Sequence, residues 1–102
     1  MAHSKHSVIA KTYDRKGNLL SIAKNSYVKT HRVQAMYAQK AGEAEEAVFL
    51  HAEIAALLKA RKPVYRIEIF RLNANGEPAP ASPCAACKIA IKEFQVQVIV
   101  HT

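Results

Sequence analysis

The chain has 102 residues, of which half are hydrophobic, and a formal net charge of +7. This length allows one small domain, residues 1–102, and leaves no room for a second core. Eighteen residues are alanine, so the core is lean, and a bound metal or self-association is expected to add stability. No apolar run approaches the roughly 18 residues of a membrane span, and residues 1–6 lack the apolar region of a secretory signal. We therefore expect a cytoplasmic protein with no membrane partner.

The basic charge is concentrated in the first 40 residues. They hold eight of the fifteen lysines and arginines and a single acid, Asp14, whereas residues 41–102 are balanced. Such a basic half suits a phosphate-bearing ligand, either a mononucleotide or a single strand of nucleic acid. The alternative interpretation is a solvated basic face that only aids solubility.

The first half of the chain predicts a β-hairpin followed by a helix. Strands are expected over residues 7–13 and 19–24, joined by a turn in which Gly17 takes a left-handed conformation. The apolar spacing then predicts a helix over 30–41, with Gly42 as its stop.

The second half predicts helices that alternate with strands: helix 45–61, strand 64–72, loop 73–81, helix 84–93 and strand 95–101. The last helix is expected to have Ser82 as its N-cap and Pro83 in its first position. Right-handed crossovers would set the last two strands parallel to each other. The sequence therefore predicts an α/β fold with a short mixed sheet of about four strands.

One histidine and two cysteines stand out as a candidate zinc site. His51-Ala52-Glu53 precedes Pro83-Cys84-Ala85-Ala86-Cys87 by about 30 residues. Three such ligands leave a fourth position open, as a catalytic zinc requires. Glu53 is a poor candidate for a fourth ligand and a good candidate for the group that moves protons to and from a water in that position.

The two halves of this site can meet only if the helices begin in the right places. Cys84 and Cys87 are three apart and share one helix face, so both sulfurs can reach one metal. His51 and Glu53 are about 200° apart on an ideal helix. The regular helix is therefore expected to begin near His51, with residues 43–50 irregular.

A structural zinc site is the alternative interpretation of the same residues. Its fourth ligand would have to come from the remaining histidines, which are His3, His6, His31 and His101. The closely spaced cysteines with a histidine upstream favour a metal site in a reducing compartment over a disulfide.

The H-x-E and P-C-x-x-C motifs resemble those of the zinc-dependent cytidine and deoxycytidylate deaminases. The order of elements is similar too, over most of the chain, and in overall style the chain is similar to small deaminase-like proteins of bacteriophages. The resemblance implies the cytidine deaminase-like three-layer α-β-α fold. Family members usually have a fifth strand, which is apparently missing here, and a homo-oligomer could cover the sheet edge that this leaves open.

Carried over to this sequence, the resemblance implies a zinc-dependent hydrolytic deaminase acting on a cytosine nucleoside or nucleotide. His51, Cys84 and Cys87 would hold Zn²⁺, and Glu53 would be catalytic. The residues with an expected substrate contact are Asn25, Ala52, Ser82, Lys29 and His31, the last two because they lie at a helix N-terminus that favours anions.

Three other functions stay open at this point. The substrate could be a base in single-stranded DNA or RNA, although aromatic residues for stacking are scarce. It could be a purine base. A non-catalytic, zinc-stabilised nucleic-acid-binding module would have no need of Glu53.

Overall fold

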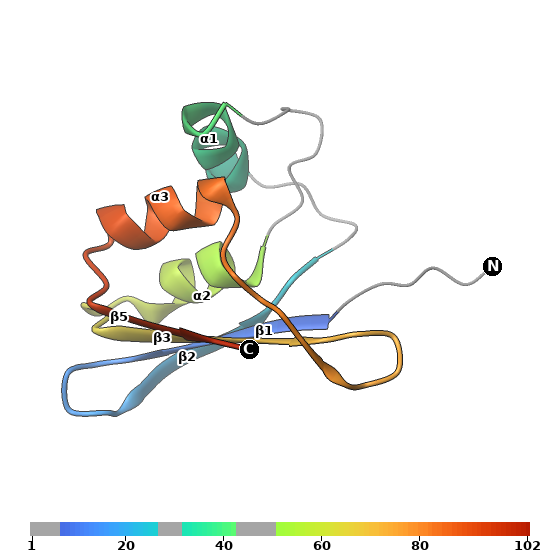
Figure 1. Cartoon of the computed structure of the whole chain (residues 1–102). Helices are drawn as coiled ribbons and strands as arrows, with labels where there is room; N and C mark the ends of the chain where they lie inside the picture. The colour runs from blue at the N-terminus through green and yellow to red at the C-terminus, as the bar shows by residue number, and fades with distance from the viewer. Residues whose placement is uncertain (1–6, 27–31, 43–50) are drawn as a thin grey trace.

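The computed structural model describes residues 7–26, 32–42 and 51–102, which form a five-stranded sheet with three helices (Figure 1). The elements are β1 (Ser7–Tyr13), β2 (Leu19–Lys24), α1 (Arg32–Lys40), α2 (Ala52–Ala60), β3 (Arg66–Leu72), β4 (Pro78–Ala79), α3 (Ala85–Glu93) and β5 (Val98–His101). The fold is α/β, and apart from the short β4 the elements follow the predicted order. None of these helices is long and apolar enough to cross a membrane.

The sheet is mostly antiparallel, with one parallel pairing. β1 lies between β2 and β3 and is antiparallel to both. β5 runs parallel to β3, as the right-handed crossover predicted. β4 continues along the same edge of β3, opposite Arg71 and Leu72. The segment predicted as a loop over 73–81 therefore contains a short strand, because the turn closed by Asn73 folds the chain back onto β3.

The β1–β2 hairpin matches its predicted bounds. Asp14 accepts hydrogen bonds from the backbone N–H groups of Lys16 and Asn18, at 2.9 and 2.8 Å. Gly17 follows with a φ of 89°, a left-handed conformation that glycine adopts without strain. The turn is thus stabilised by its own side chain, as Asp and Asn commonly do in tight loops.

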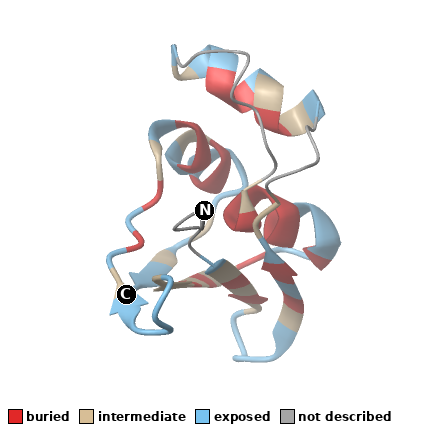
Figure 2. Ribbon diagram, turned by 90° about the vertical axis from the view of Figure 1, so that its right-hand side faces the viewer, coloured by how far each residue is buried: buried red, intermediate tan, exposed pale blue. Residues whose placement is uncertain are grey.

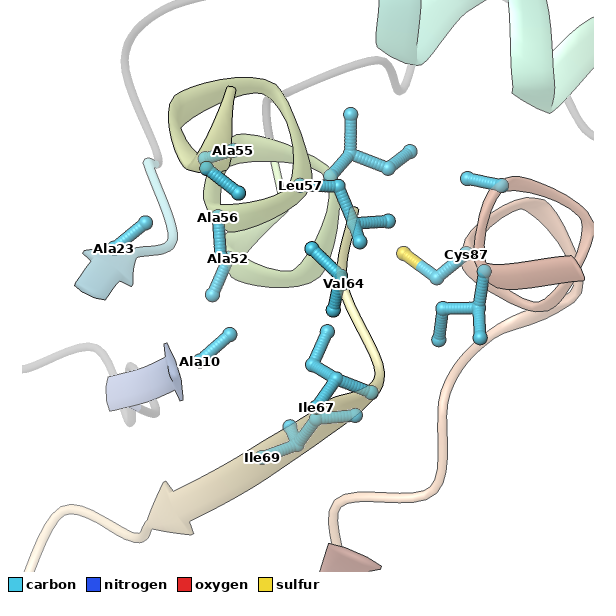
Figure 3. Close-up of a cluster of buried hydrophobic side chains, with 14 of the residues drawn as sticks. Ala10, Ala23, Ala52, Ala55, Ala56, Leu57, Val64, Ile67, Ile69 and Cys87 are labelled. Carbon is cyan, nitrogen blue, oxygen red and sulfur yellow. The ribbon is translucent and has the colours of Figure 1, made fainter. Parts of the chain in front are cut away.

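The core lies between the sheet and α2. Ala10 on β1 and Ile67 and Ile69 on β3 are fully buried and face α2, as Figure 3 shows. A polar contact anchors the helix to the sheet: the Ser21 hydroxyl donates to the Ala56 carbonyl at 2.7 Å and is itself hydrogen-bonded to Thr12. Because Ser21 has one proton to give, Thr12 is the donor in that second bond.

All three described helices lie on the same side of the sheet, and α1 is stacked above α2 and α3 (Figures 1 and 2). The expected α-β-α arrangement, with helices on both faces, is therefore not found among the described residues. The other face instead carries paired side chains, with Lys11 over the Phe70 ring and Arg66 over the Tyr13 ring. Charged and aromatic groups of this kind suit a sheet face in contact with water.

Two strands, β3 and β5, begin two and three residues later than predicted. Tyr65 stands at the margin of β3: its N–H donates to the Tyr13 carbonyl and its carbonyl accepts the N–H groups of both Gln97 and Val98, and the regular pairing begins at Arg66. β5 begins at Val98 because the residues before it still close the end of α3: the Val96 N–H donates to the Ile91 carbonyl. Both strand boundaries involve backbone hydrogen bonds between distant or irregular segments, which the strand propensities of the residues do not predict.

Candidate metal centre

His51 is the N-cap of α2, which begins at Ala52. The expectation that regular helix starts near His51 is thus confirmed, while residues 43–50 lie outside the described part. His51 has an extended backbone (φ −81°, ψ 153°), and its side chain makes no capping hydrogen bond. The imidazole is turned instead toward the cysteines of α3.

α3 begins one residue later than predicted, with Cys84 as its N-cap. The Cys84 sulfur accepts a hydrogen bond from the Cys87 backbone N–H at 3.4 Å, which is the capping role that we had assigned to Ser82. Pro83 therefore precedes the cap and does not occupy the first helical position. A sulfur in the cap position places both cysteines at the start of the helix, on the side that faces α2.

The three side chains form one compact group. His51 Nδ1 lies 3.4 Å from Cys84 Sγ and 3.3 Å from Cys87 Sγ, and all three ligand atoms lie within 4.8 Å of one another. A tetrahedral zinc with Zn–S of about 2.3 Å and Zn–N of about 2.1 Å separates N and S by about 3.6 Å. The residues present fit a metal ion of this kind without rearrangement of the backbone.

The electrostatics of the group favour metal binding. Hydrogen bonds from Cys87 and His51 lower the pKa of the Cys84 thiol to about 4, against its burial. Cys84 is therefore a thiolate at neutral pH, the form that binds metals. The N-termini of α2 and α3 both point at the group, and their dipoles favour negative charge there.

Glu53 lies in the first turn of α2, two residues after His51, and is buried, with 6 % of its surface exposed. Burial raises the pKa of its carboxyl, while the nearby His51 and Cys87 oppose that shift. A carboxyl group with a raised pKa in a partly apolar site can both accept and release a proton near neutral pH. Figure 3 shows Cys87 on α3 with its sulfur pointing toward α2, the helix that carries Glu53.

Among the described residues, the group contains these three metal-ligating side chains and no fourth. His101, considered above as a fourth ligand, is exposed at the end of β5, where its Nδ1 lies 3.0 Å from the Thr102 carbonyl. His3, His6 and His31 lie outside the described residues.

The structure describes three of the five residues that were predicted to contact the substrate. Ala52 is buried at the first position of α2, beside the metal ligands. Asn25 follows β2, and its side-chain carbonyl accepts the Val8 N–H at 3.0 Å, so one of its groups holds the sheet together. Ser82 is exposed two residues before Cys84. Lys29 and His31 lie outside the described residues.

One residue that positions the site was not predicted. Gln34 on α1 is 2 % exposed, and its side-chain oxygen accepts the His51 backbone N–H at 3.0 Å. Its role is to hold the chain in place where α2 begins. The only sequence signal was a glutamine in a helix, which is usually a surface residue.

Comparison with protein-family models and with curated proteins gave no match for this sequence. Any assignment of function therefore depends on the site itself.

Proposed function

We propose that this protein is a zinc-dependent hydrolytic deaminase that converts the cytosine ring of a nucleoside or nucleotide to uracil and releases ammonia. The observation that carries the proposal is the group of His51, Cys84 and Cys87 with a buried acid, Glu53, beside it. Either feature alone has a simpler explanation. Together they match a metal site built for hydrolysis.

The three ligands would hold the ion, and a zinc ion held there supplies a Lewis acid that activates water. The rest of the chemistry falls to the protein. Glu53, with its raised pKa, takes a proton from the water and delivers it to the ring nitrogen next to the carbon under attack. It would then take the second proton from the hydroxyl group added to that carbon and pass it to the departing amine, so that water and the amino-pyrimidine yield the oxo-pyrimidine and ammonia.

Substrate contacts are assigned to residues at the same end of the molecule. The first N–H groups of α2, including that of Ala52, have no partner inside the helix and are suited to a polar edge of the base. Asn25 is assigned to the base or sugar by its position directly after β2. Ser82 stands next to the P-C-x-x-C segment, where a hydroxyl can reach a substrate held between the two helices.

The basic N-terminal half supports a second substrate class, a cytosine within single-stranded DNA or RNA. A mass-resolved deamination assay separates the two. Its panel contains cytidine, deoxycytidine, their monophosphates, adenosine, guanine and a mixed single-stranded oligonucleotide. We expect conversion of one small cytosine substrate.

Glu53→Ala is the decisive variant in this assay. It should retain the metal, because the ligands are untouched, and lose turnover by about 10²-fold or more. Lys88→Ala, on the exposed side of α3, is the control and should leave turnover unchanged. Normal turnover by Glu53→Ala would refute the mechanism. A metal-loaded protein that converts nothing in the panel would favour the non-catalytic zinc module.

A further inference from the structure

A groove of about 570 Å³ lies at the end of α2 and α3 opposite to the metal ligands. Its walls are the segments that follow the two helices, Lys62 to Tyr65 and Phe94 to Gln97, together with the β1–β2 turn. In Figure 1 this end of the molecule is on the left, where the hairpin turns. Both helices have nine residues, so the groove is about 14 Å from the group at their N-termini.

The groove carries a net positive charge. Arg15 and Lys16 come from the hairpin turn and Lys62 from the segment after α2. The one acid among the lining residues is Asp14, and both of its oxygens already accept hydrogen bonds within the turn. The three cations therefore outnumber the one carboxylate among the described lining residues, and the groove keeps a net positive charge, as expected of an anion site.

The end of α3 opposes an anion less than a helix C-terminus with unpaired carbonyls would. The carbonyls of Ile91 and Lys92 are already bound, by the N–H groups of Val96 and Gln95. The groove floor is therefore not lined by unsatisfied acceptors of that turn.

Aromatic rings and side-chain amides also line the groove. Phe94 is a large exposed hydrophobic residue at the end of α3, and Tyr65 lies under the Arg15 guanidinium, 4.6 Å from it. Gln95 and Gln97 add side-chain amides. The groove thus combines cations that can bind a phosphate with an aromatic ring and amides that can contact a planar heteroaromatic ring attached to it.

Gln95 also has an unusual backbone conformation. Its φ is 60°, in the left-handed region, at a position after a helix where glycine is the usual residue. A residue other than glycine costs stability in this conformation, and a role of the Gln95 side chain in the groove would offset that cost.

We propose that this groove is a second binding site, separate from the metal centre, for a nucleotide unit of single-stranded nucleic acid. Arg15, Lys16 and Lys62 hold the phosphate, and the base lies against Phe94 within reach of the Gln95 amide. A free mononucleotide has the same chemistry, and the experiment distinguishes it from the strand.

The test is fluorescence anisotropy of a labelled single-stranded decanucleotide, with cytidine monophosphate and unlabelled strand as competitors. It uses the Glu53→Gln protein, so that no turnover interferes. The logarithm of the affinity should fall with the logarithm of salt concentration with a slope of about −0.7 or steeper, as expected when the groove neutralises at least one phosphate of a single strand. Lys62→Glu should weaken binding by about tenfold, whereas Lys88→Glu, with the same charge change outside the groove, should have little effect.

Gln95→Gly separates a binding role from a structural one. Glycine fits the left-handed backbone, so the variant should unfold at the same or a higher temperature while its affinity falls several-fold. Competition by the strand alone would assign the site to nucleic acid. Equal competition by the monophosphate would assign it to a free nucleotide.

Absence of binding, or equal losses in Lys62→Glu and Lys88→Glu, would overturn the proposal. Because the readout is binding and the residues lie a helix length from Glu53, failure of the deaminase assignment would leave this result unaffected. Conversely, a failure of the strand to bind this groove would not affect the turnover of a small substrate at the metal centre.

Discussion

Two residues of the described chain, Arg61 and Gln95, hold a left-handed backbone without being glycine. Each lies just after a helix, where the chain must turn back toward the sheet. A side chain costs about 1 kcal/mol or more in this conformation. Such a cost is tolerated when the side chain has another task or when the turn is held by its hydrogen bonds, as in the Gln95 turn.

We expect Gln95→Gly to raise the free energy of unfolding by about 1 kcal/mol, because glycine removes this strain. Urea unfolding monitored by circular dichroism measures it. Lys88→Gly, in the middle of α3, is the matched control and should lower the same quantity by about 1 kcal/mol. A loss of stability in both variants would show that the Gln95 side chain supports the fold.

At the scale of elements, α1 is tied to the site through one buried amide. Replacing Gln34 with alanine removes the partner of the His51 N–H in a partly buried place, at a cost of about 1–3 kcal/mol. It should also weaken metal binding by about tenfold, since the start of α2 is no longer held. Competition with a zinc-binding dye measures the affinity. Gln34→Glu can accept the same hydrogen bond and should bind metal more tightly than Gln34→Ala.

A second link joins α1 to α3. Lys40 and Tyr37 both donate to the Glu93 carboxylate, at 2.8 and 3.1 Å. These two partners lower the pKa of Glu93. A lowered pKa means that this contribution to stability is present above the ordinary carboxyl pKa and is lost as the pH falls through the lowered value.

The melting temperature of the wild type should therefore exceed that of Glu93→Gln near neutral pH, and the difference should shrink as Glu93 is protonated. The effect is small, because the ion pair is half exposed. Melting curves of both proteins from about pH 7 to pH 3 test this. A difference that grows toward acid would contradict the assignment.

At the scale of the whole molecule, β5 is the exposed edge of the sheet. Within the described chain no strand pairs with its outer side, and Ile99 and Val100 are each 44 % exposed. An apolar edge strand of this kind is a ready surface for pairing with another strand. We predict that two copies pair through β5.

Light scattering at micromolar concentration should give a mass above the 11.3 kDa of one chain. Val100→Lys places a charge on this edge and should return the protein to the monomer mass, whereas Lys24→Ala, on the opposite edge strand β2, should not. A monomer mass for the wild type would rule out self-association as the cover of this edge.

Local signals in the sequence were sufficient for much of the fold. The hairpin bounds and the Gly42 stop follow from turn chemistry and from residue periodicity, and the start of α2 follows from the need for His51 and Glu53 to converge on one site. The pairing of His51 with the two cysteines was also predictable, because ligand type and spacing are properties of the sequence. The roles of Ser82 and Pro83 were not, because a cysteine sulfur is an unusual N-cap.

The tertiary structure alone decided three things. It placed every described helix on one face of the sheet, which depends on how the connections pack. It buried Gln34 against His51, and it formed the basic groove from three segments far apart in sequence. The physical reason is the same in each case: preferences along the chain specify local conformation, whereas contacts between distant segments depend on which surfaces the folded core leaves available.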